Sequence, residues 1–214
     1  MSARTEVEVL QWLDEEFAWR RKELTTIWAD VNSPESKSRP ARLRGGTALL
    51  YAHWEGFVRA ASEVYVEFVA RRRLQYTELC PGLLALALRR RLNSLVSSDD
   101  ASAQVSFVEF ILGGLGSHAR LPKLGVIKTG GNLNSRRLRA IVVTLGLDYS
   151  AFELKENLID SQLLDWRNKI AHGKLLCPTE QDFELLYQET SGLLRNFKDQ
   201  ISNAVILRAY LRKR

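Results

Sequence analysis

The chain contains 214 residues, a length that corresponds to one globular domain or at most two small ones. Hydrophobic residues make up 45% of it and charged residues 26%, with 13 Gly and 5 Pro; this composition excludes the disordered, collagenous and low-complexity classes. Its 31 basic residues against 25 acidic ones give a net charge of +6, which favours a polyanionic partner.

Apolar residues recur at steps of three and four along most of the chain, which is the spacing of amphipathic helices. A first helix is predicted over 6–31, and Asn32-Ser33-Pro34 ends it. The ten residues from Pro34 are predicted to form a loop, and Thr47 is the predicted N-cap of a second long helix that ends near Arg73. The remaining predicted helices cover 79–96, 100–112, 134–145, 155–172 and, after Pro178, the chain to about Arg212.

Glycines accumulate in residues 113–133, which are predicted to be an irregular connector with room for a small hairpin around Leu124 to Lys128. The sequence contains no series of strand patterns and no internal repeat. We therefore predict an all-α protein in which residues 1–214 form a single helical-bundle domain with long N- and C-terminal helices.

Neither targeting segments nor metal motifs are found in the sequence. Cys80 and Cys177 lie far apart and fall in no CxxC or Cys/His spacing, so neither a disulfide framework nor a zinc site is predicted. The N-terminal segment lacks the apolar stretch of a secretory signal, and no apolar run reaches the roughly 18 residues of a membrane helix. We expect a cytoplasmic protein that binds no membrane and requires no metal or cofactor.

The residues most suited to chemistry gather in the segment LIDSQLLDWRNKIAHG, residues 158–173. Its apolar stripe consists of Ile159, Leu163, Trp166 and Ile170. On the opposite side, Asn168 and His172 are neighbours at i and i+4. Arg167 lies about 140° from His172 and about 7.5 Å along the axis, so it approaches the face of His172 only by reaching around the helix. Two copies packed about a two-fold axis would gather two Arg and two His.

Each of these residues also has an ordinary structural explanation. A histidine in the last helical turn before a glycine, as His172 is, stabilises the helix dipole without doing chemistry. Arg167 and Asp165 fit a solvated helix face. In the segment His53-Trp54-Glu55-Gly56-Phe57 the aromatic residues are typical of a packed helix with a polar flank, and the alternative is that Glu55 contacts Arg167 and orients it.

The stretch Arg167-Asn168-Lys169-Ile170-Ala171-His172 resembles the R-N-x-x-x-H signature of HEPN domains (higher eukaryotes and prokaryotes nucleotide-binding). These are helical, usually dimeric proteins that include metal-independent ribonucleases. Further blocks within about residues 47–175 resemble the HEPN-like nucleases of prokaryotic toxin and defence loci, namely Tyr51–Val58, Asn132–Ser135, Leu145–Asp148 and Leu158–Asp160. The resemblance implies a HEPN fold.

The same resemblance implies an endoribonuclease that uses the 2′-hydroxyl of RNA as the nucleophile. His172 would be the general acid or base, because an unperturbed imidazole titrates near pH 6.5. Arg167 would stabilise the phosphate, and Asn168 would orient His172 or contact the substrate. The chain has 3 His, so a mechanism with two histidines favours a homodimer that supplies His172 twice. No carboxylate cluster has metal-ligand spacing, which agrees with metal independence.

Two other functions compete with this hypothesis. One is a non-catalytic HEPN module that binds nucleotide, RNA or a partner protein, and the other is a helical scaffold in which the RNxxxH match is accidental. Four basic clusters are candidates for an RNA-tracking surface or are solvated helix ends, namely Arg71–Arg73, Arg89–Arg91, Arg136-Arg137-x-Arg139 and Arg208-x3-Arg212-Lys213-Arg214. For the ribonuclease, the resemblance also implies a toxin or phage-defence role and a cognate antitoxin or regulatory protein.

Overall fold

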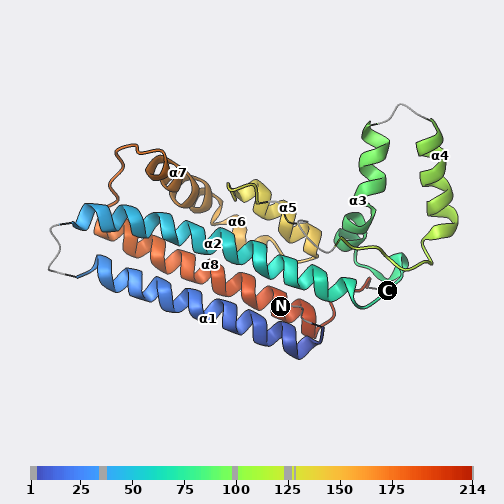
Figure 1. The fold of residues 1–214 in the computed structure, drawn as a ribbon, viewed down its shortest axis with the longest axis horizontal. Coiled ribbons are helices and arrows are strands. Elements are labelled where there is room, and N and C mark those ends of the chain that lie inside the picture. The colour runs from blue at the N-terminus through green and yellow to red at the C-terminus, as the bar shows by residue number, and fades with distance from the viewer. Residues whose placement is uncertain (1–3, 34–37, 98–100, 123–126, 128, 214) are drawn as a thin grey trace.

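Three long helices form the centre of the structure, which is a computed structural model that describes residues 4–33, 38–97, 101–122, 127 and 129–213. Helices α1 (Glu6–Val31), α2 (Arg39–Ala70) and α8 (Glu180–Ile206) lie side by side, and each of them contacts the other two (Figure 1). The bounds of α1 are those predicted from its apolar spacing. Much of the core lies between these helices. Helix α2 contributes a long series of buried apolar residues to it, and α1 and α8 contribute further ones.

Local sequence signals explain where α1 and α8 begin. Thr5 accepts a hydrogen bond from the backbone of Glu8, whose side chain accepts one from the backbone of Thr5. Thr179 and Asp182 form the same reciprocal arrangement at α8. Such capping boxes satisfy backbone N–H groups that a helix start leaves without partners.

Helix α2 begins at Arg39, so the predicted start at Thr47 is wrong. The hydroxyl of Thr47 donates to the carbonyl of Leu43 at 2.8 Å and is buried inside the helix, and it therefore caps nothing. Pro40 is tolerated here because the first turn of a helix needs no intrahelical N–H donor. The tertiary ion pair between Arg42 and Asp30, at 3.0 Å, joins this first turn to α1.

A second layer lies across α2 and contains α5 (Ser135–Leu145), α6 (Ser150–Glu153), η3 (Leu158–Leu164) and α7 (Asp165–Ala171) (Figure 1). Asn134 caps α5 and Gly146 ends it in the left-handed conformation, as predicted. The helix predicted over 155–172 is present, but η3 is a π-helical stretch and only its continuation, α7, is a regular α-helix.

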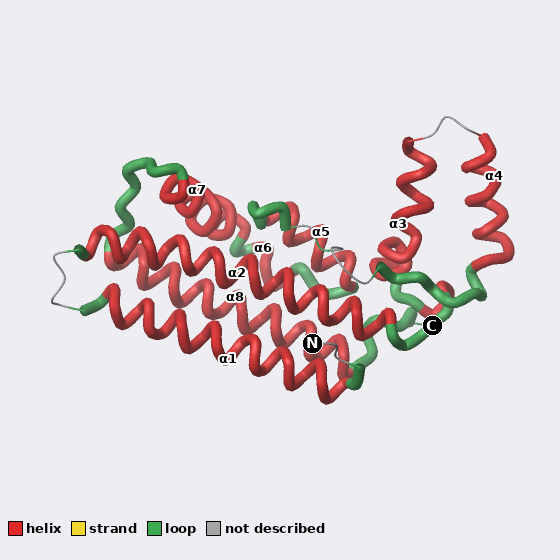
Figure 2. The backbone as a smooth tube through the Cα atoms, viewed as in Figure 1, coloured by secondary structure: helices red, strands yellow, loops and turns green. Residues whose placement is uncertain are grey.

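Helices α3 (Pro81–Ser97) and α4 (Ala101–Glu109) form an arm that projects from one end of the bundle (Figures 1 and 2). A 3-10 turn, η1 (Tyr76–Glu78), precedes the arm, and a π-helical turn, η2 (Phe110–Gly114), extends α4. In the described part of the chain the β structure consists of isolated bridges, such as the one between Gln75 and His118. Residues 123–126 and 128, where a hairpin was expected, lie outside the described residues.

The last helix is shorter than predicted, because α8 ends at Ile206 and not near Arg212. Arg208 has φ +52°, which turns the chain back across the start of α3. There Cys80 N donates to the carbonyl of Tyr210, and Arg212 N donates to that of Glu78, both at 2.8 Å. Among the helices that the structure describes, none has the length and apolar character needed to span a membrane.

Candidate functional site

Helix α7 carries the R-N-x-x-x-H segment and ends at its histidine. His172 is the C-cap, and Gly173 follows with φ +70°. Gly173 N donates to the carbonyl of Ile170 at 3.1 Å, and Lys174 N donates to that of Lys169 at 2.9 Å. This pair of bonds is a Schellman motif, which requires the left-handed residue that glycine supplies. The motif fixes the backbone of His172 and leaves its side chain exposed.

The chain that leaves α7 is tied back to α2. Arg44 Nη1 donates to the carbonyls of Lys174 and Leu176, at 2.8 Å in each case. A charged donor makes these hydrogen bonds stronger than neutral ones. The chain just after His172 is thereby fixed relative to α2.

Arg167 points toward α2, where Tyr51 and Glu55 lie one turn apart. Its Nη2 is 3.9 Å from Glu55 Oε2, and its Cζ lies 4.6 Å from the centre of the Tyr51 ring. Its Nη1 donates to Asn168 Oδ1 at 2.7 Å. The Arg167 side chain is nevertheless 28% exposed, whereas that of Glu55 is 13% exposed. The guanidinium is therefore held by three neighbours and still accessible to a ligand.

Asn168 uses both ends of its side-chain amide within the protein. Besides accepting from Arg167, it donates from Nδ2 to Asn132 Oδ1 at 3.1 Å. We predicted that Asn168 orients His172 or contacts the substrate, whereas these hydrogen bonds connect it to Arg167 and Asn132. The Asn168 amide therefore joins Arg167 to Asn132, which precedes Asn168 by 36 residues.

Asn132 belongs to a glycine-rich loop, residues 129–133, at the end of the stretch that is predicted to be an irregular connector. Gly130 and Gly131 have φ +67° and +66°, which is a conformation that favours glycine. Arg137 Nη1 donates to the carbonyls of Thr129 and Asn132, at 3.1 and 2.7 Å. The adjacent glycines followed by Asn are the signal that marks this loop, but nothing in the sequence indicates that it reaches α7.

The loop also contacts α2, because Leu133 N donates to the Tyr51 hydroxyl at 2.5 Å. Burial raises the pKa of Tyr51, and the neighbouring Glu55 carboxylate raises it further. The phenol therefore stays protonated at physiological pH. Tyr51 thus touches both the loop and Arg167, the first through its hydroxyl and the second through its ring.

The other two histidines lie elsewhere. His53 is buried on the α1 side of α2, with its Nε2 3.2 Å from Glu23 Oε2 and its ring against Trp19. Burial lowers the pKa of His53. His118 pairs with Gln75, beyond the end of α2, and that end is about 28 Å from Tyr51 at 1.5 Å per helical residue. Among the described residues of one protomer, neither of the other two histidines therefore lies beside His172.

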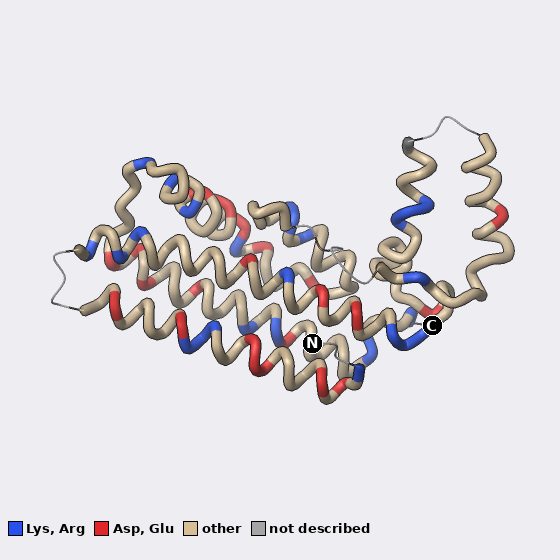
Figure 3. The backbone as a smooth tube through the Cα atoms, viewed as in Figure 1, with Lys and Arg blue, Asp and Glu red and all other residues tan. Residues whose placement is uncertain are grey.

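Basic and acidic residues are interspersed along the helices (Figure 3). Several members of the basic clusters make internal contacts. Arg71 pairs with Glu67 at 2.6 Å, Arg72 stacks on Phe68, and Arg139 pairs with acidic residues of the second layer. A contribution of these clusters to RNA binding remains a prediction.

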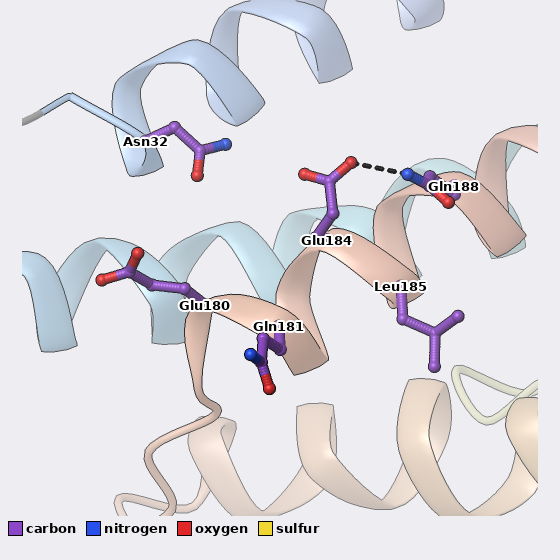
Figure 4. Close-up of a pocket in the computed structure, with 6 residues that line it drawn as sticks. All are labelled: Asn32, Glu180, Gln181, Glu184, Leu185 and Gln188. Carbon is purple, nitrogen blue, oxygen red and sulfur yellow. Dashed lines mark hydrogen bonds between the residues drawn. The ribbon is translucent and has the colours of Figure 1, made fainter.

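A shallow pocket of about 380 Å³ lies between the end of α1 and the start of α8 (Figure 4). Its lining residues are Asn32, Glu180, Gln181, Glu184, Leu185 and Gln188. Neither Arg167 nor His172 belongs to it, and its two carboxylates disfavour a phosphate ligand. Within the described ranges, no group of three or more His, Cys, Asp or Glu side chains is placed to hold a metal ion.

Comparison with known proteins identifies the family. The model of the RiboL-PSP-HEPN family matches residues 15–203, so the chain belongs to this family and to the HEPN superfamily. No curated protein and no solved structure matches the chain significantly. The predicted superfamily and the predicted all-α fold are thereby confirmed. The matched range contains α7 and the parts of α2 and the loop that surround Arg167.

Proposed function

We propose that the protein is a metal-independent endoribonuclease, in which Arg167 stabilises the phosphate and His172 is the general acid or base. The observation that carries this proposal is the fixed yet accessible Arg167 guanidinium, on the same short helix that ends at an exposed histidine. A positioned charge of this kind favours a phosphorane over a ground-state phosphodiester.

In the proposed reaction the 2′-hydroxyl attacks the adjacent phosphorus while a base removes its proton. The bond from phosphorus to O5′ breaks, and an acid protonates that oxygen. The products are a 2′,3′-cyclic phosphate and a 5′-hydroxyl, so DNA is not a substrate. Imidazole suits both proton transfers, and general acid-base catalysis contributes about 10²- to 10⁴-fold.

A homodimer is part of the proposal, because two imidazoles are needed and one protomer presents His172 alone. Isologous packing places the same surface of each protomer opposite its twin. Apolar residues are available on this side of the molecule. Leu175, just after α7, is 98% exposed, and Trp166 and Ile170 are only half-buried.

The biological role we propose is a toxin of a toxin-antitoxin system or a phage-defence effector. Its support is the resemblance to HEPN-like nucleases of such loci. The activity of such an RNase has to be inhibited in the cell that produces it, and we propose a cognate antitoxin or regulatory protein as its partner.

A second function, a non-catalytic module that binds nucleotide, RNA or protein, is favoured by one observation. In the described structure no side chain holds the imidazole of His172, and its place at the C-cap is also that of an ordinary capping residue. Arg167 would then bind a phosphate without turnover.

One experiment separates the two functions. Purified protein is incubated with end-labelled RNA and a matched DNA in excess EDTA, with His172→Ala as the test variant. His118→Ala is the control, because it removes an exposed histidine from another part of the fold. RNA cleavage with 2′,3′-cyclic phosphate ends, lost only in His172→Ala, supports the ribonuclease. RNA binding without cleavage by the wild type supports the binding module.

A further inference from the structure

The geometry points to Asn132 as a positioning residue of this site: it holds Asn168, which in turn orients the Arg167 guanidinium. The inference rests on the proposed function and adds to it an element, the loop 129–133, that lies outside the R-N-x-x-x-H segment. Tyr51 completes the arrangement, because it contacts both the loop and Arg167.

The contacts form a closed ring. Arg167 donates to Asn168 at 2.7 Å, and Asn168 donates to Asn132 at 3.1 Å. The next residue, Leu133, donates to Tyr51 at 2.5 Å, and the Tyr51 ring lies 4.6 Å from the guanidinium carbon. Three segments that are distant in sequence, α2, the loop and α7, thus each contribute to the ring.

The amide of Asn168 needs a fixed partner if it is to orient an arginine. An amide can rotate by half a turn, which exchanges its acceptor oxygen for its donor nitrogen. The Asn132 oxygen accepts a hydrogen bond and therefore favours the orientation in which Nδ2 faces the loop. In that orientation Oδ1 faces Arg167, which can only donate. The donor-only guanidinium and the Asn132 oxygen therefore select the same orientation of Asn168, and Asn132 holds the amide in it from the side away from Arg167.

The loop is itself held in place, so it can fix Asn168. The Arg137 guanidinium bridges the carbonyls of Thr129 and Asn132 on one side of the loop. A Cβ atom at Gly130 would lie 2.9 Å from that guanidinium, and φ there is already +67°. A side chain at this position would therefore displace Arg137 or strain the loop.

The test compares cleavage of RNA by the wild type, Asn132→Ala, Asn132→Asp and Asn168→Ala. Asn132→Ala is expected to lower kcat by about 10-fold, the effect of losing one neutral hydrogen bond in the transition state, with a smaller change in KM. Asn132→Asp keeps an acceptor for Asn168 Nδ2 and should recover most of kcat. The double variant Asn132→Ala/Asn168→Ala should be no slower than Asn168→Ala alone, because both changes break one chain of contacts.

Asn32→Ala is the matched control, since it removes an asparagine side chain that also makes a hydrogen bond, but at the end of α1. Its Nδ2 donates to the carbonyl of Trp28 at 2.9 Å, away from the ring. It should leave kcat per folded molecule unchanged. A readout independent of activity is the side-chain amide signal of Asn168 in ¹H-¹⁵N spectra. That signal should shift in Asn132→Ala and stay in place in Asn32→Ala.

The outcomes distinguish this inference from the proposed function. If the wild type cleaves RNA, Arg167→Ala does not, and Asn132→Ala has wild-type kcat, the inference is wrong and the ribonuclease stands. If the wild type cleaves no RNA, the proposed ribonuclease activity is wrong. The amide signal of Asn168 then decides by itself whether Asn132 holds Asn168. An Asn168 signal that is the same in Asn132→Ala as in the wild type would overturn the inference in either case.

Discussion

The pair formed by Glu55 and Arg167 leads to a prediction with two opposite effects. Glu55→Gln removes the carboxylate charge and keeps the shape of the side chain. Arg167 then presents more of its positive charge to a phosphate, so RNA binding should become tighter. It also loses one of the three contacts that orient it, so turnover should become slower. A residue that merely stabilises the fold would not separate these two quantities.

The magnitude follows from the geometry. At 3.9 Å and an effective dielectric constant of about 20, two unit charges interact by about 4 kcal/mol. The 28% exposure of the arginine admits solvent screening, which leaves about 1 kcal/mol. RNA affinity should therefore rise about fivefold at low salt, and kcat should fall about tenfold.

Binding is measured by fluorescence anisotropy in a His172→Ala background, which prevents cleavage during the titration, at two salt concentrations. Glu67→Gln is the control, because it removes the same charge from α2 at an ion pair with Arg71, away from the site. Equal affinity and equal kcat for Glu55→Gln and the wild type would refute the reasoning. The reasoning would also be refuted if RNA affinity and kcat both fell in proportion to the amount of folded protein.

Three further predictions concern the fold. Thr179→Ala removes the capping box of α8 and should cost about 1 kcal/mol, or about 2–4 °C in Tm by calorimetry. Thr26→Ala removes an exposed hydroxyl that donates to the carbonyl of Lys22, one turn earlier, and should change Tm little. Trp54→Ala empties a fully buried site and should lower the free energy of unfolding in urea by about 3–5 kcal/mol. Val7→Ala, at an exposed position, should lower it by less than about 0.5 kcal/mol. Similar urea midpoints for the two variants would contradict the core described above. Burial lowers the pKa of His53, so the unfolded chain binds a proton there more readily than the folded one, and stability should decline as the pH falls below about 6.5. In His53→Phe this part of the pH dependence should disappear, and an unchanged slope between pH 7 and 5 would show that other groups cause it.

Much of the helical architecture was predictable from the sequence because its signals are local. The apolar spacing of α1 gave both of its ends, and Asn134 and Gly146 gave those of α5. Caps of this kind act within three or four residues, so no knowledge of the partner helices is needed. The same holds for the turn at Gly173, which ends α7.

The errors occurred where long-range contacts override local preference. The first turn of α2 contains Pro40, which is typical of a loop, but an ion pair to Asp30 fixes Arg42 there. The apolar pattern continues to Leu211 and therefore predicts a later end for α8 than the structure has. In the structure that stretch leaves the helix and bonds to Glu78 and Cys80.

The candidate site divides in the same way. The sequence by itself determined α7 and its closing turn, and with them the exposed place of His172 at the helix end, because those features depend on neighbouring residues. Only the tertiary structure decided how Arg167 is held. Arg167 contacts Glu55 and Tyr51 of α2, and through Asn168 it is connected to Asn132, which lies 36 residues before Asn168. No spacing rule relates segments that are so far apart in sequence. Packing of the second layer across α2 brings them together, and that packing depends on the whole core.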